Sequence, residues 1–162
     1  MYNNINPMSL LRQKPQAIAQ IAGSRDYPNI RGSVRFFQTR TGVIVLADIS
    51  GLPSGSGECK KPIFAMHIHG GGSCSGNATD PFADALTHYN PNDCPHPSHA
   101  GDMPPLFGCS GAALSAFMTD RFTVREVIGR TVIIHANPDD FTSQPAGNSG
   151  TKIACGVIRA SR

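Results

Sequence analysis

All six histidines of the chain lie between positions 67 and 135, and this clustering is the feature of the sequence best suited to chemistry. Two of them, His67 and His69, alternate within an apolar run that has the composition of a β-strand. Because successive side chains of a strand point to opposite faces, both imidazoles stand on one face and form a chelating pair. Such a pair also occurs in strands without any metal, so it needs support from the other histidines.

A second group of candidate ligands follows in the string HYNPNDCPHPSHAGD. Three imidazoles and one carboxylate form the closed four-ligand set that suits structural zinc, and the prolines between them stiffen the loop. The alternative is a polar surface loop with scattered histidines, which leaves four ligand-type side chains within fifteen residues unexplained. The sequence therefore predicts a zinc site at His88, His96, His99 and Asp102.

The elements that must position these side chains are short strands. With 17 glycines, 13 prolines and only 15% charged residues, the composition disfavours long helices. Seven runs are alternating or rich in β-forming residues, which predicts an all-β sandwich or barrel. These runs are 17–22, 32–38, 43–49, 63–69, 112–119, 131–135 and 153–158. We expect a flexible arm over 1–15 followed by one domain over 16–162.

The segment 70–108 is the long irregular part of the expected fold. A loop of this length is uncommon in a small domain unless function or a metal organises it. Within it, Asp80 before Pro81 predicts a short helical turn over 80–86. Farther along the chain, Thr123 and Glu126 match a capping box over one more turn. The sixth histidine, His135, ends the apolar run 131–135. A single histidine at a strand end does not indicate a metal site, so His135 is a candidate ligand only in combination with the other histidines.

Charge and hydropathy exclude several classes of function. The net charge of +3 is too small and dispersed for a nucleic-acid partner, although it helps to attract a small anion. No stretch approaches the ~20 apolar residues of a membrane span. The run 8–11 has no basic region before it, so we expect no secretory leader and a cytoplasmic location, or export if a leader precedes the given sequence. Five cysteines are an odd number, which leaves at least one thiol unpaired.

Five ordered motifs resemble the copper-zinc superoxide dismutase family, particularly its bacterial members. They are HIH at 67–69, HYNP at 88–91, HAGD at 99–102, IGRTVIIH at 128–135 and GNSGTKIACGVI at 147–158. The resemblance implies a Greek-key β-sandwich or barrel of about eight antiparallel strands, with long metal-binding and electrostatic loops. It also implies disproportionation of superoxide to oxygen and hydrogen peroxide, by redox cycling of copper beside structural zinc.

The same resemblance assigns the ligands. It implies copper at His67, His69, His88 and His135, and zinc at His88, His96, His99 and Asp102, so that His88 is shared and delivers a proton to peroxide. Four imidazoles suit Cu(II), whereas a mixed nitrogen and oxygen set suits zinc, so ligand chemistry agrees with this division. Asp139 resembles the family carboxylate that links a copper-side histidine to a zinc-side one.

The sequence departs from the family pattern at one position that bears on rate. Lys152 stands where the family typically has an arginine beside copper, and a flexible point charge attracts an anion without a planar fork of donors. We therefore expect dismutase activity that is present but reduced.

The resemblance also implies a disulfide between Cys74 and Cys155. We expect a second bond between Cys94 and Cys109, which would leave Cys59 free.

Two alternatives to a superoxide dismutase remain on sequence grounds. A non-enzymatic superoxide dismutase-like domain would bind copper or zinc for transfer, storage or structure, although all seven candidate ligands are retained. A zinc hydrolase or a cupin would need a general base and an open metal position, and the histidine-rich set argues against it. The expected partner is the superoxide anion, and the choice between a homodimer and a monomer stays open.

Overall fold

The computed structural model describes residues 13–55, 57 and 62–161. Most of the expected arm, and Cys59, lie outside these residues. The described elements are β1 (Ala17–Gly23), β2 (Arg31–Gln38), β3 (Val43–Ser50), β4 (Ile63–Phe64), β5 (Met66–His69), the 3-10 turn η1 (Ala83–Ala85), β6 (Leu106–Phe107), β7 (Ala112–Thr119), the one-turn helix α2 (Val124–Val127), β8 (Thr131–His135) and β9 (Lys152–Ala160).

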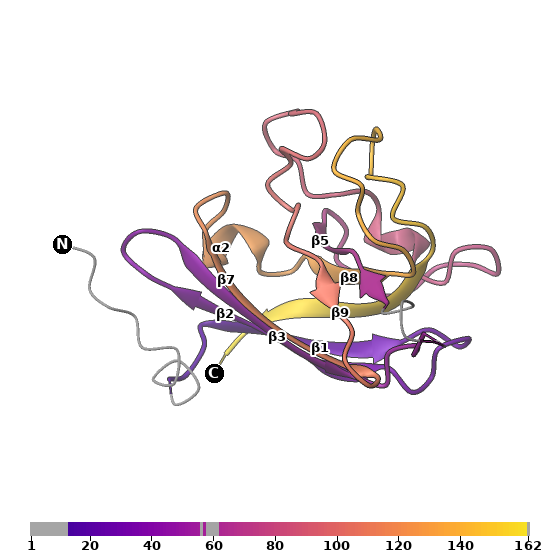
Figure 1. Cartoon of the computed structure of the whole chain (residues 1–162). Coiled ribbons are helices and arrows are strands. Elements are labelled where there is room, and N and C mark those ends of the chain that lie inside the picture. Colours follow the sequence, from indigo (N-terminus) through magenta and orange to yellow (C-terminus); the bar gives the residue numbers. More distant parts are fainter. Residues whose placement is uncertain (1–12, 56, 58–61, 162) are drawn as a thin grey trace.

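Seven of these strands form one antiparallel sheet in the order β5-β8-β9-β1-β2-β3-β7, while β4 and β6 pair separately. The sheet is curled, and long loops rise over β5 and β8 (Figure 1). After β3 the chain crosses to the opposite edge of the sheet to form β5, and β7 then returns to lie beside β3. The prediction of an all-β fold is confirmed, and helix is confined to single turns in the described part of the chain.

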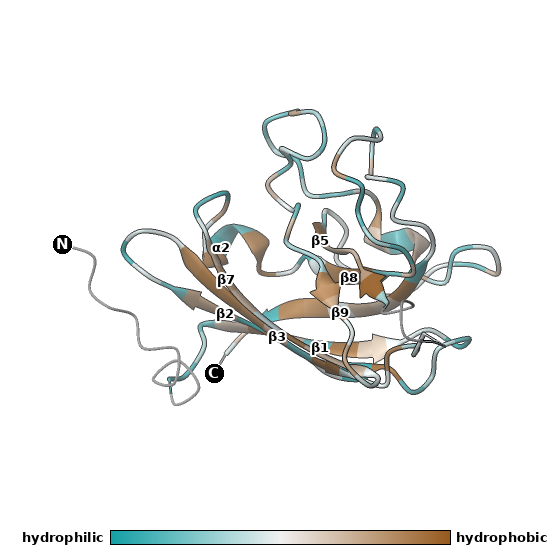
Figure 2. Cartoon of the chain, in the orientation of Figure 1, coloured by the Kyte–Doolittle hydropathy of each residue, from teal (hydrophilic) through white to brown (hydrophobic). Residues whose placement is uncertain are grey.

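The core lies inside the curl of the sheet. In β1, for example, Ala17, Ala19 and Ile21 are buried while the residues between them are more exposed. Alternate side chains of the other long strands join the same cluster, and the apolar stretches of the strands are coloured brown in Figure 2. The two-residue period that predicts the strands therefore also fixes which face of the sheet is filled.

The expected strand over 63–69 is divided at Ala65, whose backbone bonds to another segment. Its N–H donates to the carbonyl of Asn137, and its carbonyl accepts from the N–H of His135. After this break, Met66 and Ile68 join the main core. His67 and His69 therefore face the opposite side of the sheet, beneath the long loops.

Both predicted turns exist, although one is shorter than expected. The turn over 80–86 is a 3-10 turn of three residues, η1. Thr123 and Glu126 form the predicted capping box at the start of α2. No helix among the described residues is long and apolar enough to cross a membrane.

Candidate metal centre

Strand β5 presents two buried histidines to the loop that carries the predicted zinc ligands. His67 lies opposite Asp102, and His69 lies opposite His88, in isolated antiparallel bridges outside the regular ladders. The N–H of Ile68 also donates to the carbonyl of Gly101 at 2.9 Å. The loop is therefore hydrogen-bonded along β5, which brings side chains distant in sequence to one place.

Gly101 explains why the loop can approach β5 so closely. A Cβ atom at this position would lie 2.2 Å from the carbonyl oxygen of Ile68, closer than any side chain tolerates. The glycine in the HAGD motif thus permits backbone contact with the strand, and it places Asp102 beside the histidines.

Four buried histidines form the first set of candidate ligands. Their nitrogen atoms lie within 4.8 Å of one another, and they belong to His67, His69, His88 and His135. The Nδ1 of His69 donates to the carbonyl of Leu86 at 2.8 Å, and that of His135 donates to the carbonyl of Gly150 at 3.2 Å. Each ring therefore presents Nε2, and these two Nε2 atoms lie 3.2 Å apart.

The remaining nitrogens of this first set have the character of metal ligands. His67 uses Nε2 to donate to Asp139, so its Nδ1 faces the other rings. That Nδ1 and the Nε2 of His88 are buried and have no hydrogen-bond partner. A buried polar atom without a partner is costly, and a metal ion supplies the missing interaction. Four convergent imidazole nitrogens fit copper.

The second set surrounds the carboxylate of Asp102. Its Oδ1 lies 2.8 Å from the Nδ1 of His88, and its Oδ2 lies 3.1 Å from the Nδ1 of His96 and 3.3 Å from that of His99. The contact to His96 is close but not aligned as a hydrogen bond, so this buried Nδ1 also lacks a partner. Three nitrogens and one carboxylate oxygen within 4.8 Å fit tetrahedral zinc.

His88 joins the two sets through its two ring nitrogens. Its Nδ1 belongs to the second set, while its Nε2 faces the first set, where its ring centroid lies 3.9 Å from that of His67. The ring centroid of His99, on the other side, lies at 5.4 Å. The structure therefore places the shared histidine where the sequence predicts it.

Asp139 connects one histidine from each set. Its Oδ2 accepts from the Nε2 of His67 at 2.8 Å, and its Oδ1 accepts from the Nε2 of His96 at 2.9 Å. Burial raises the pKa of Asp139, but the hydrogen bonds from His67, the N–H of Phe141 and His96 outweigh burial and hold the pKa well below its usual value. An ionised Asp139 directs the Nδ1 atom of both histidines toward the candidate metals.

Comparisons with known proteins agree with this geometry. A family model described as copper/zinc superoxide dismutase matches residues 30–158. The chain belongs to the copper/zinc superoxide dismutase family. Cu-Zn superoxide dismutase 2 of Aquifex aeolicus is 33% identical over 143 residues, which are 79% of this chain and 78% of the relative. Cu-Zn superoxide dismutase of Deinococcus radiodurans is 32% identical over 149 residues, covering 81% and 78%.

A solved structure supports the same fold. The Cu/Zn superoxide dismutase from Brucella abortus has a TM-score of 0.72, with 87% of this chain and 98% of that chain covered. Its sequence identity is 22%, so it bears on the fold alone. Together with the intact histidine sets, the family match identifies this chain as a copper/zinc superoxide dismutase, an oxidoreductase that uses copper and zinc.

Burial keeps two candidate copper ligands of this dismutase, His69 and His135, in the form that binds metal. It lowers the pKa of His69 well below the usual value, and the neighbouring His135 and His88 lower it further. Burial likewise lowers the pKa of His135 from 6.5 to about 3. Neutral imidazole is the ligand form of histidine, so both rings are ready for a metal at neutral pH without first losing a proton.

Gln144 supports the zinc loop through a contact that the sequence does not predict. The side-chain oxygen of Gln144 accepts from the N–H of His96 at 3.0 Å, and its side-chain nitrogen donates to the carbonyl of His96 at 2.7 Å. This clamp joins the loop after β8 to the peptide of a zinc ligand. The sequence gives no signal of this contact, because Gln144 is 48 residues away from His96 and lies in a segment whose composition is ordinary for a surface loop.

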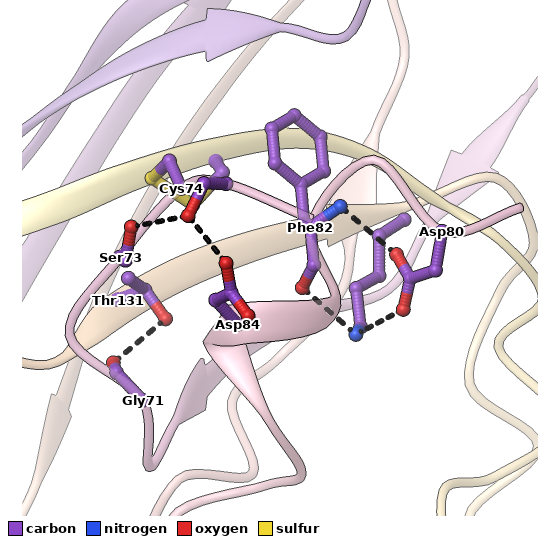
Figure 3. Close-up of a disulfide and its surroundings, with 10 residues drawn as sticks. Gly71, Ser73, Cys74, Asp80, Phe82, Asp84 and Thr131 are labelled. Atoms are coloured by element: carbon purple, nitrogen blue, oxygen red, sulfur yellow. Dashed lines mark hydrogen bonds and ion pairs between the residues drawn. A yellow bond between two sulfur atoms is a disulfide. The ribbon is translucent and has the colours of Figure 1, made fainter. Parts of the chain in front are cut away.

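Lys152 begins β9 directly opposite His135 in the β8–β9 register. Its ammonium group donates to the carboxylate of Asp80 at 2.7 Å and to the carbonyl of Phe82 at 3.0 Å. Figure 3 shows the labelled Asp80 and Phe82 oxygens converging on this one nitrogen. In the sequence Asp80 indicates only a turn, and its contact with Lys152 emerges only in the structure.

One predicted disulfide is confirmed and the other is wrong. Cys74 and Cys155 are bonded and tie the loop after β5 to β9 (Figure 3). Cys94 and Cys109 both carry free thiols in the described part of the chain. Each is fixed by its own turn, Cys94 by backbone bonds to the side chain of Asn90 and Cys109 by a tight pairing with Ala112. The two cysteines flank the zinc ligands in sequence, but their thiols do not bond to each other in the structure.

Proposed function

We propose that His88 and Lys152 are the catalytic residues of this dismutase, with His88 carrying a proton and Lys152 guiding the superoxide anion. The observation that carries the proposal is the position of His88, which has one ring nitrogen in each ligand set. When bound, copper supplies the one-electron chemistry by which one superoxide is oxidised to oxygen and another, taking up two protons, is reduced to hydrogen peroxide.

The surroundings of His88 suit proton transfer at a single atom. Asp102 and the zinc set hold Nδ1, so the ring cannot turn and Nε2 keeps its direction. Nε2 is buried, and no protein group competes for it. A proton held at Nε2 is therefore delivered to the departing peroxide from a fixed position, which is the requirement for efficient general-acid catalysis.

The position of Lys152 suits the attraction of an anion. Its side chain is 15% exposed and stands opposite His135, one of the candidate copper ligands. A positive charge at the edge of a cleft raises the local concentration of an anionic substrate and its rate of association. Because an ammonium group lacks the donor fork of a guanidinium, we propose that the rate is lower than with arginine.

The experiment loads the purified chain with one copper and one zinc and follows the loss of superoxide and the formation of hydrogen peroxide. We expect one peroxide for every two superoxide anions consumed, at a rate far above spontaneous dismutation. Lys152→Arg is expected to raise this rate, and an unchanged or lower rate would refute the guiding role. A fully loaded chain without dismutation would favour the non-enzymatic metal-binding domain instead.

His88→Gln tests the proton role separately, because glutamine keeps a polar side chain but cannot carry a transferable proton. We expect this variant to lose rate most strongly as the pH rises and protons from water become scarce. Equal loss at every pH would indicate a role in metal binding alone.

A further inference from the structure

The pair formed by Lys152 and Asp80 stands apart from the other charges of the molecule. It is the only ion pair that a lysine or arginine makes with a carboxylate among residues 13–55, 57 and 62–161. Its nitrogen and oxygen lie 2.7 Å apart, and the two side chains are 15% and 37% exposed. The pair is thus half-sheltered, with less screening by water than a contact between two fully exposed groups.

Asp80 is held in place by its own loop. The Oδ1 of Asn77 accepts from the N–H of Asp80 at 3.0 Å, and the Oδ1 of Asp80 accepts from the N–H of Phe82 at 3.0 Å. The disulfide from Cys74 joins this loop to β9 at a position three residues after Lys152. The carboxylate therefore reaches the ammonium group from a loop that hydrogen bonds and a disulfide hold in place.

The hydrogen bonds of Lys152 limit what it can offer to an anion. An ammonium group has three N–H donors. One donor goes to Asp80 and a second goes to the carbonyl of Phe82. One donor is left for an incoming anion, and the negative charge of Asp80 lies next to it.

Asp80 is ionised at neutral pH. Burial raises its pKa, but hydrogen bonds from Lys152 and from the N–H of Phe82 outweigh burial and hold the pKa below the usual value. An anion that approaches Lys152 therefore meets a nearly neutral pair.

We propose that Asp80 is a positioning residue and fixed counter-ion for Lys152, which aims the ammonium group and lowers its attraction for anions at the copper site. The inference rests on the guiding role proposed for Lys152. On this proposal, the carboxylate of Asp80 reduces the attraction of anions in addition to the effect proposed for lysine in place of arginine.

The test uses Asp80→Asn in the chain loaded with copper and zinc. Asparagine is nearly the same shape, and its side-chain oxygen can still accept one of the two hydrogen bonds, but the charge is gone. Azide, a small anion that binds copper, is titrated and followed by copper absorption. We expect its dissociation constant to fall by about fivefold, the effect of removing a unit charge ~4 Å away in water. The superoxide rate should rise at low salt and approach the wild-type rate at high salt.

Asp84→Asn is the matched control, because it removes a charge from the same loop. Asp84 is exposed, and its carboxylate accepts a hydrogen bond from Ser75 and forms no ion pair with Lys152. We expect azide affinity unchanged in this variant. If Asp84→Asn tightened azide binding as much as Asp80→Asn does, the effect would not be specific to the Lys152–Asp80 pair. Unchanged or weaker azide binding in Asp80→Asn would overturn the inference. If Asp80→Asn does not fold, Asp80→Ser keeps a hydroxyl for the loop and is measured in the same way.

Lys152→Met distinguishes failure of the inference from failure of the guiding role. If this variant binds azide as well as the wild type, the guiding role is wrong. If it binds azide more weakly while Asp80→Asn binds no tighter, Lys152 guides anions but Asp80 does not restrain it.

Discussion

Replacement of Asp139 by asparagine tests how strongly one carboxylate controls two metal sites. The carboxylate accepts hydrogen bonds from the Nε2 atoms of His67 and His96 at the same time. Asparagine has one oxygen, so it can accept from only one ring, while its NH₂ group faces the other. That second ring must then release its Nε2 proton and carry it on Nδ1, the atom needed for the metal.

The expected magnitude follows from the loss of one ligand's orientation. Loss of a hydrogen bond that orients a metal-binding histidine typically lowers metal affinity by about 10- to 100-fold, or roughly 1.4–2.8 kcal/mol. His96 is held independently by Gln144, so its peptide stays in place while its ring is disturbed. We therefore expect Asp139→Asn to weaken zinc or copper binding by at least tenfold, without unfolding the metal-free domain.

The assay is competition with a chelator of known affinity, for zinc and copper separately, with thermal unfolding of the metal-free protein as a check on the fold. Asp140→Asn is the matched control, because this neighbouring aspartate is exposed and its side chain bonds only within its own turn, to Thr142 and Ser143. If both variants bind both metals like the wild type, or if both lose affinity equally, the orienting role of Asp139 is wrong.

Three further predictions concern stability and packing. Replacing Cys74 and Cys155 together by serine should lower the free energy of unfolding by about 2–4 kcal/mol in a urea titration, and no change would contradict the disulfide. In metal-free protein, burial lowers the pKa of His135 from 6.5 to about 3. Between these pH values the unfolded chain binds a proton at His135 and the folded chain does not. Stability should therefore fall as the pH drops from 6.5 toward 3, and a flat profile in denaturant titrations would refute this. Gly147→Ala should weaken zinc binding in the chelator assay, because its Cβ would lie 2.0 Å from the Asp139 carboxylate.

Gly129→Ala is the control for the glycine prediction. Gly129 also has a positive φ, of 87°, but its added Cβ would meet no atom within 4 Å. It therefore reproduces the backbone strain of Gly147→Ala without the collision. Equal zinc affinity in both alanine variants would show that the collision at Gly147 has no effect.

The sequence predicts most of the ligand site because its information is local. Alternation places His67 and His69 on one face, and the three residues before His135 are apolar, so the strand that ends there is expected to be buried. The three histidines and the aspartate of the loop lie within fifteen residues, which is close enough for one ion to collect them. The division at Ala65 is not predictable in this way, because it depends on hydrogen bonds to residues about seventy positions away.

The contacts that tune the site are the part that sequence reasoning could not reach. Asp80 matches a turn pattern in which one carboxylate oxygen bonds to the N–H of Phe82. This pattern does not predict that the other oxygen accepts a hydrogen bond from Lys152. The sequence around Gln144 likewise does not predict its two hydrogen bonds to His96, because these form only when the two loops pack together. The wrong pairing of Cys94 with Cys109 has the same origin, because closeness to the zinc ligands in sequence does not determine distance in the fold.

The central claim is that His88 is shared between copper and zinc, and anomalous diffraction at both absorption edges tests it most directly. On crystals of the loaded protein, we predict two separate peaks. Copper should lie ~2 Å from the Nε2 of His88 and zinc ~2 Å from its Nδ1. A single peak, or two peaks of which only one contacts His88, would contradict the account.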